Sequence, residues 1–179
     1  MMNFKIKNSG IKFQGKVFDL KVDEIVYDSG NEGIREVAVH PGGAVAVAVK
    51  ENGKIIFVKQ YRYPLDKSLI ELPAGKLEKD EDPMHCAVRE LEEETGYQAG
   101  KIEKLGSIFT TPGFCTEELH IYLANDLKNG NHNREEGEFG MQILEYPLDD
   151  IEEKIKAGEI KDSKTICGIY MYKNKSVQK

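Results

Sequence analysis

An acidic segment near the middle of the chain has the residue types for metal chemistry. Four glutamates follow Arg89 closely, at positions 90, 92, 93 and 94, and Glu81 precedes them. Carboxylates gathered this densely are stable when a cation lies among them, and divalent ions that join carboxylates to substrate phosphates are the usual partners. The segment therefore predicts metal-dependent chemistry on a small phosphorylated substrate.

The acidic residues lie on a predicted helix over residues 82–95. Asp82 is the expected N-cap, Pro83 is suited to the first helical position, and Gly96 is expected to end the helix. The expected apolar face consists of Met84, Ala87, Val88 and Leu91. These signals define both ends of the element that must position the carboxylates.

Three of the four glutamates share one face of this helix. At about 100° per residue, Glu90, Glu93 and Glu94 lie together and Glu92 points nearly opposite. Like charges at this spacing cost about 0.2–0.5 kcal/mol per pair, so a counter-charge is needed. A solvated acidic surface is the plainer alternative. It does not account for residues 69–75 leading into the helix, or for a glycine at each end of the segment.

Residues 75–97 resemble the Nudix box in full. The family pattern is Gly, five residues, Glu, seven residues, Arg-Glu, an aliphatic residue, any residue, Glu-Glu, any residue, Gly and an aliphatic residue, and only Tyr97 departs from it, as an aromatic. The resemblance implies an enzyme that hydrolyses nucleoside diphosphate derivatives with Mg²⁺, or with Mn²⁺ in its place. It implies Ala74 (through its carbonyl), Glu90, Glu93 and Glu94 as metal ligands. Arg89 and Glu93 are implied in catalysis, with Glu81 in support.

Segments outside the box resemble the ADP-ribose pyrophosphatase group of the family. Pro112 follows Tyr97 by 15 positions, and residues 35–37, 60–64, 71–78 and 162–166 resemble the same group, so the likeness covers most of residues 16–170. It implies hydrolysis of ADP-ribose to AMP and ribose 5-phosphate. The expected substrate contacts are Arg35, Glu36 and Arg62 at the adenosine, Glu117 near the terminal ribose, and Pro112.

Some of these roles have simpler alternatives. Arginine suits both phosphate contacts and stacking on a base, but Arg35 and Arg62 could equally be ordinary strand-edge charges. In this group a glutamate on a loop after the box often serves as general base, for which we rank Glu136 first and Glu138 second. A charged loop can also be merely solvated.

The surrounding sequence predicts the fold. Strand-like runs occupy residues 17–27, 34–40, 44–50 and 55–61, and Asn52-Gly53 favours a hairpin in which residues 44–49 and 55–58 pair as buried central strands. Further strands are expected at 102–109, 118–124 and 139–145, a loop at 128–138, and helices at 148–157 and from 162 onward, with fraying from Lys173. We predict an α/β (α+β) Nudix fold, a mixed β-sheet sandwiched between helices with an N-terminal antiparallel β extension.

Length, composition and charge limit the domain organisation, the binding partners and the cellular location that can be expected. With 179 residues, 40% of them hydrophobic, the chain suits a Nudix hydrolase domain at 43–179, preceded by an N-terminal β segment at 1–42. The resemblance implies a homodimer in which that segment contributes to dimerisation and substrate contacts. A formal charge of −6 argues against nucleic-acid binding. The absence of a long apolar run or signal peptide favours a cytoplasmic protein without a membrane partner.

Rival functions remain within and outside the enzyme class. Another Nudix substrate, such as a GDP-sugar, a dinucleoside polyphosphate or a damaged nucleotide, fits the box equally well. A non-catalytic module that senses ADP-ribose or NAD-like ligands would be expected to have lost box carboxylates. All of them are present here, so we favour an enzyme.

Overall fold

The computed structural model describes residues 3–131 and 140–177 and divides into two compact units. The first unit contains Met1–Gly42 together with Phe109–Glu118, and the second contains Gly43–Ile108 with Leu119–Lys179. Within the described residues, no helix is both long and apolar enough to cross a membrane.

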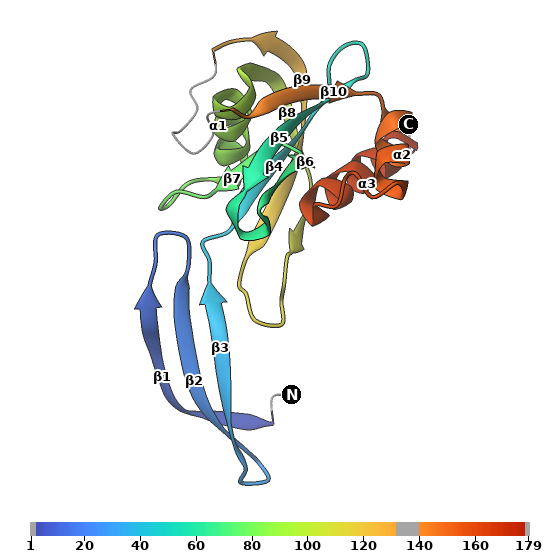
Figure 1. Ribbon diagram of the computed structural model, residues 1–179. Helices are drawn as coiled ribbons and strands as arrows, with labels where there is room; N and C mark the ends of the chain where they lie inside the picture. The colour runs from blue at the N-terminus through green and yellow to red at the C-terminus, as the bar shows by residue number, and fades with distance from the viewer. Residues whose placement is uncertain (1–2, 132–139, 178–179) are drawn as a thin grey trace. The chain divides into compact units, whose positions relative to one another are not determined.

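The first unit is built on a three-stranded antiparallel sheet, drawn in blue in Figure 1. Its strands β1 (Phe4–Gln14), β2 (Asp19–Tyr27) and β3 (Glu32–Val39) follow one another in space as in sequence. The segment 109–118 is attached to β3, because Ala38 donates its N–H to the Phe114 carbonyl at 2.8 Å and accepts from Thr116 N at 3.0 Å. The predicted N-terminal antiparallel extension is confirmed.

The second unit contains two sheets. In the four-stranded sheet, β4 (Gly43–Ala48) lies between β7 (Ala74–Lys76), which is antiparallel to it, and β9 (Glu118–Asn129), which is parallel, and β8 (Tyr97–Phe109) forms the edge next to β9. In the three-stranded sheet, β5 (Ile55–Arg62) lies between β10 (Gln142–Tyr146) and β6 (Lys67–Glu71). A short 3₁₀ helix, η1 (Tyr63–Leu65), joins β5 to β6.

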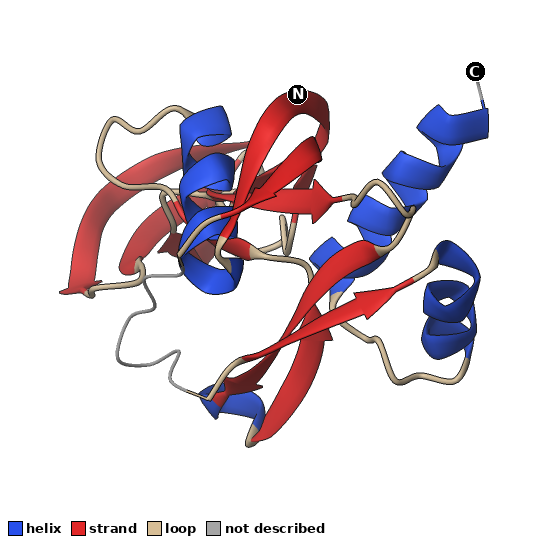
Figure 2. Ribbon diagram, turned by 90° about the horizontal axis from the view of Figure 1, so that it is seen from above, coloured by secondary structure: helices blue, strands red, loops and turns tan. Residues whose placement is uncertain are grey.

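Helices cover these sheets on two sides, as Figures 1 and 2 show. The helix α1 (Pro83–Thr95) lies on one side, and α2 (Leu148–Lys156) and α3 (Ser163–Val177) lie on the other. The predicted sandwich of mixed sheet and helices is therefore confirmed.

Alternation along β4 explains why both faces of this strand are buried. Ala46 and Ala48 pack with Leu91 of α1, whereas Val45 and Val47 pack in the same cluster as Ile169 of α3. Successive side chains of a strand point to opposite faces, so one short apolar run serves two cores. The small alanines leave room for α1 to approach the sheet closely.

The predicted pairing of β4 with β5 is wrong. The turn itself forms, with Gly53 at φ 78° and the Lys50 N–H donating to the Lys54 carbonyl at 2.9 Å. Beyond one antiparallel bridge between Val49 and Ile55, however, the two strands enter different sheets. Both edges of β4 are occupied by β7 and β9, so its backbone groups are already paired.

Two boundaries also differ from prediction. The helix α3 continues to Val177 instead of fraying from Lys173. Lys173 pairs with Glu152 of α2, and Lys175 pairs with Glu103 of β8. The strand β9 runs to Asn129 and includes residues expected in a loop.

Candidate functional site

The acidic helix begins and ends as its sequence predicts. The Asp82 carboxylate accepts from the backbone N–H of Met84 at 2.8 Å, and Pro83 occupies the first turn. At the other end, Gly96 adopts φ 74° and its N–H donates to the Glu92 carbonyl at 2.7 Å. A left-handed residue at this position favours glycine because a Cβ would be strained there.

The buried face of α1 differs from the predicted apolar face and includes two carboxylates. Its buried residues are Cys86, Ala87, Glu90, Leu91, Glu94 and Thr95. Met84, predicted on this face, is 38% exposed, whereas Glu90 and Glu94 are only 8% and 2% exposed. Ala87 and Leu91 are buried as predicted, and the buried face extends to Glu90 and Glu94, which border them, and not to Met84.

Gly75 allows one of these carboxylates to reach β7. A Cβ built on Gly75 would lie 1.9 Å from Glu90 Oε1, a distance at which the two atoms cannot coexist. A side chain at position 75 would therefore displace the Glu90 carboxylate from its place against β7. This close approach links the first residue of the box directly to a carboxylate 15 positions later.

The second buried carboxylate bonds to the same short strand. Glu94 Oε2 accepts from the Ala74 backbone N–H at 3.2 Å. The preceding residue, Pro73, is joined to the central strand because its carbonyl accepts from Ala46 N at 2.9 Å. The structure thus brings Ala74, Glu90 and Glu94 together, three of the four predicted metal ligands.

Arg89 gathers the remaining acidic side chains of the site. Its Nε and Nη2 each donate to one oxygen of Glu81 at 2.9 Å. Its Nη1 donates to Glu90 Oε1 at 2.7 Å and to Glu93 Oε2 at 3.0 Å. The pKa of Arg89 is raised, chiefly by the hydrogen bonds to Glu81, and those bonds lower the pKa of Glu81 to about 2. One guanidinium therefore offsets the repulsion among three carboxylates.

Glu92 points away from this group, as predicted. It accepts from Gln98 Nε2 at 2.6 Å on the exposed side of the helix.

The donor atoms suit a hard cation, since they are carboxylate and carbonyl oxygens. Among the residues that the structure describes, no three His, Cys, Asp or Glu side chains have the arrangement of a formed metal site. Glu90 and Glu93 are instead paired with Arg89.

Arg62 is not a loose strand-edge charge. Its Nε and Nη2 donate to the two oxygens of Glu71 at 2.8 and 2.6 Å, in a bidentate pair. Glu71 is 1% exposed, while the Arg62 side chain is 37% exposed. No local signal in the sequence indicates that Glu71 pairs with Arg62, although Glu71 belongs to one of the segments that resemble the pyrophosphatase group.

The other predicted substrate contacts lie in the first unit. Arg35, on β3, donates to the Tyr27 hydroxyl, and its guanidinium lies 5.7 Å from the Tyr27 ring centroid and 6.0 Å from that of Phe4. Glu36 is the next, exposed residue of β3. Two aromatic rings thus hold Arg35, which the sequence did not indicate.

Pro112 and Glu117 occupy the segment 109–118. Pro112 lies in a turn closed by the Cys115 N–H donating to the Thr111 carbonyl at 2.9 Å. Glu117 accepts from Thr110 Oγ1 at 2.8 Å, which orients its carboxylate. The two predicted base residues, Glu136 and Glu138, lie outside the described residues.

Comparisons with known proteins agree with this architecture. The NUDIX domain family model matches residues 39–167. An ADP-ribose pyrophosphatase of Bacillus subtilis (strain 168) is 44% identical over 159 residues, covering 88% of this chain and 85% of the relative. A methanol dehydrogenase activator of Bacillus methanolicus has the same identity and coverage. A crystal structure of an ADP compounds hydrolase, 15% identical, superimposes with a TM-score of 0.84 over 97% of this chain and 94% of the other, and supports the fold alone.

Proposed function

The chain belongs to the Nudix family, and from that premise we propose that it hydrolyses the diphosphate bond of ADP-ribose to AMP and ribose 5-phosphate. The observation that carries this proposal is the meeting of Glu90 and Glu94 with Ala74 and Gly75, which gathers oxygen donors where a polyphosphate-bound cation needs them. The Bacillus subtilis relative, named an ADP-ribose pyrophosphatase, supports the choice of substrate.

Nudix hydrolases depend on divalent metal ions, and we propose Mg²⁺ for this chain, with Mn²⁺ as a substitute. Ala74 (through its carbonyl), Glu90, Glu93 and Glu94 would hold it. Such an ion would offset the charge of the diphosphate and lower the pKa of a water, so that a base could take its proton as the water attacks phosphorus. Arg89 holds the carboxylates of Glu81, Glu90 and Glu93 close together through its hydrogen bonds.

The remaining predicted groups are assigned to substrate. Arg62, expected at the adenosine, would instead bind the diphosphate, because it is cationic, partly exposed and anchored on Glu71. Arg35 and Glu36 would contact the adenosine, with Pro112 and Glu117 near the terminal ribose. Glu136, or else Glu138, would serve as the general base. These roles remain predictions.

We also propose that the protein is a cytoplasmic homodimer to which residues 1–42 contribute. Several large apolar side chains of the first unit support a partner surface, since they are exposed on it: Ile6, Ile11, Phe13 and Ile34.

Substrate profiling tests the proposal. The protein is incubated with Mg²⁺ and, separately, ADP-ribose, GDP-mannose, a diadenosine polyphosphate and an oxidised nucleotide, and products are separated by ion-exchange chromatography. The highest kcat/KM is expected for ADP-ribose. A higher kcat/KM for another compound would replace the substrate but keep the chemistry, whereas no turnover of any would favour the binding module.

A further inference from the structure

Residues 162–166, which resemble a segment of the pyrophosphatase group, lie at the start of α3. Asp162 caps this helix, since its Oδ2 accepts from Thr165 N at 3.0 Å and from Thr165 Oγ1 at 2.6 Å. Lys164 lies in the first turn and is buried, although lysine is seldom buried without a partner. The buried ammonium therefore requires an explanation.

Lys164 completes an ion network with Arg62, Glu71 and Asp162. Its Nζ donates to Glu71 Oε2 and lies 3.0 Å from Asp162 Oδ2. The network has two positive and two negative side chains. Burial alone would raise the pKa of Glu71, but the hydrogen bonds from Arg62 and the charge of Lys164 outweigh it and lower that pKa. Glu71 thus stays ionised in the interior.

The backbone around Glu71 is held by the same helix. The Leu72 N–H donates to Thr165 Oγ1 at 2.8 Å. A Cβ built on Gly168 would lie 2.8 Å from Leu72 Cδ1, so α3 and the end of β6 are in close contact. The Glu71 carboxylate therefore has little freedom to move, and it provides a rigid anchor.

Arg62 is the one member of this network with a substantially exposed side chain. Guanidinium carries five N–H groups, and the bonds to Glu71 use one on Nε and one on Nη2. Within the described part of the chain, Nη1 has no hydrogen-bond partner. A free arginine loses considerable side-chain entropy when it binds an anion, and a bidentate anchor removes that loss in advance.

We propose that Glu71 and Lys164 are positioning residues that hold the Arg62 guanidinium ready to bind a phosphate oxygen of a nucleoside diphosphate. This inference rests on the proposed function, in which Arg62 contacts the diphosphate. Buried ion pairs are often replaceable by apolar side chains without loss of stability. Three largely buried charged side chains around one exposed cation are therefore better explained by binding than by stability.

Steady-state kinetics with ADP-ribose and Mg²⁺ test the proposal on Glu71→Gln, Lys164→Met, Arg62→Ala and the double variant Arg62→Ala/Glu71→Gln. We expect Glu71→Gln to raise KM about tenfold, as for loss of a charge-assisted contact, with kcat changed less than about twofold. Lys164→Met is expected to raise KM in the same direction by about threefold. In the Arg62→Ala background, Glu71→Gln is expected to have no further effect on KM.

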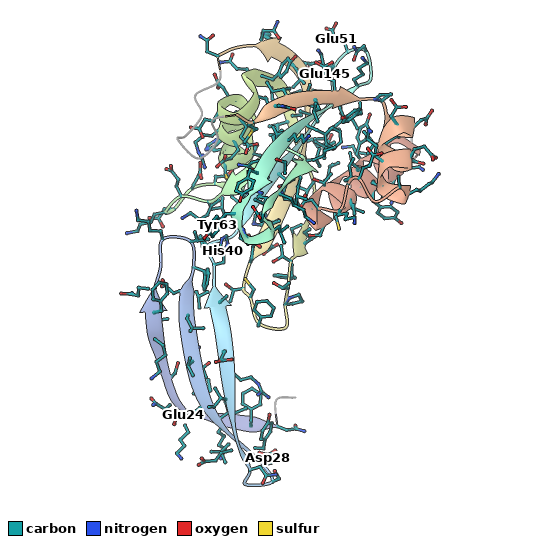
Figure 3. All side chains as sticks on the ribbon, viewed as in Figure 1. Glu24, Asp28, His40, Glu51, Tyr63 and Glu145 are labelled. Carbon is teal, nitrogen blue, oxygen red and sulfur yellow. The ribbon has the colours of Figure 1, made fainter. Side chains whose placement is uncertain are left out.

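Lys50→Met is the matched control. Lys50 forms a half-buried pair with Glu145 at 2.7 Å. Figure 3 places Glu145 and Tyr63, the neighbour of Arg62, at opposite ends of the second unit. This variant loses a lysine ion pair of the same fold and should keep the wild-type KM. Melting temperatures of all variants identify any that are unfolded.

Two outcomes would overturn the inference. One is an unchanged KM in a folded Glu71→Gln variant, and the other is an equal effect of Glu71→Gln with and without Arg62. If the wild type does not hydrolyse ADP-ribose, the substrate assignment fails separately. The inference is then judged by thermal stabilisation with inorganic diphosphate in EDTA, which Glu71→Gln should reduce and Lys50→Met should not. Equal stabilisation of the variants, or none in the wild type, would contradict it.

Discussion

At the scale of single residues, the close approach of Gly75 and Glu90 connects the backbone of β7 to the acidic face of α1. A side chain as small as a methyl group at position 75 would meet Glu90 Oε1 at 1.9 Å. We expect Gly75→Ala to lower kcat/KM by about 100-fold or more, because a displaced carboxylate loses most of its electrostatic role. Gly106→Ala is the control, since its Cβ would meet only the flexible end of Met171 at 3.3 Å. Equal activity of the two variants would contradict the assigned role of Glu90.

Replacement of Glu94 tests whether its carboxylate is one of the proposed metal ligands. Glutamine can keep the bond from Ala74 N while removing the charge. We expect Glu94→Gln to lower kcat by about 10²–10³ or more, with a melting temperature close to that of the wild type. Glu92→Gln, on the opposite face, should retain full activity. Activity near wild type in Glu94→Gln would remove Glu94 from the ligand set.

The pair of Glu81 with Arg89 makes the free energy of unfolding depend on pH in the acidic range. The pKa of Glu81 is lowered from 4.5 to about 2 by Arg89, so the stability it provides is complete above about pH 4.5 and is lost as pH falls toward 2. We expect Glu81→Gln, studied without metal, to flatten the pH dependence of the unfolding free energy between these values. Urea denaturation at several pH values measures it. A wild-type slope in this variant would show that the pair with Arg89 does not stabilise the fold.

At the scale of elements, α1 depends on its cap. Asp82→Ala removes the acceptor for Met84 N and should lower the unfolding free energy by about 1 kcal/mol. Asp82→Ser keeps a capping oxygen and should lose only a few tenths of that. Urea unfolding at neutral pH compares the two. Equal losses would mean that the cap contributes little to α1.

The sequence predicted α1 well because its end signals are local. Asp82, Pro83 and Gly96 act within one helical turn, so they need no knowledge of the fold. The burial of Glu90 has no such local signal, because its carboxylate lies against Gly75 of another element, where a larger residue would meet it. For the same reason the β4–β5 turn was predicted, but the partners of β4 were not. Those partners, β7 and β9, are distant in sequence.

At the scale of the whole molecule, long-range ion pairs were the hardest to predict. The box and its companions indicated the family and the acidic face, yet nothing local connects Glu71 to Lys164, 93 positions later. The contacts of Arg35 with the rings of Tyr27 and Phe4 were not predicted for a similar reason, because the pairing of strands brings these rings together.

Assembly is also a property of the whole molecule. If the exposed apolar side chains of the first unit are covered by a second copy, light scattering after size exclusion should give twice the chain mass of 20.2 kDa. Replacement of Phe13 and Ile34 by serine should shift the mass toward one chain, because apolar burial stabilises such an interface. A single-chain mass for the wild type would exclude the homodimer.

Product analysis with ADP-ribose, in the presence of Mg²⁺ and after its removal by EDTA, tests the proposed metal-dependent hydrolysis. We expect equal amounts of AMP and ribose 5-phosphate with Mg²⁺, and none with EDTA until Mg²⁺ is restored. Unchanged hydrolysis in EDTA, or intact ADP-ribose with Mg²⁺, would contradict the proposal.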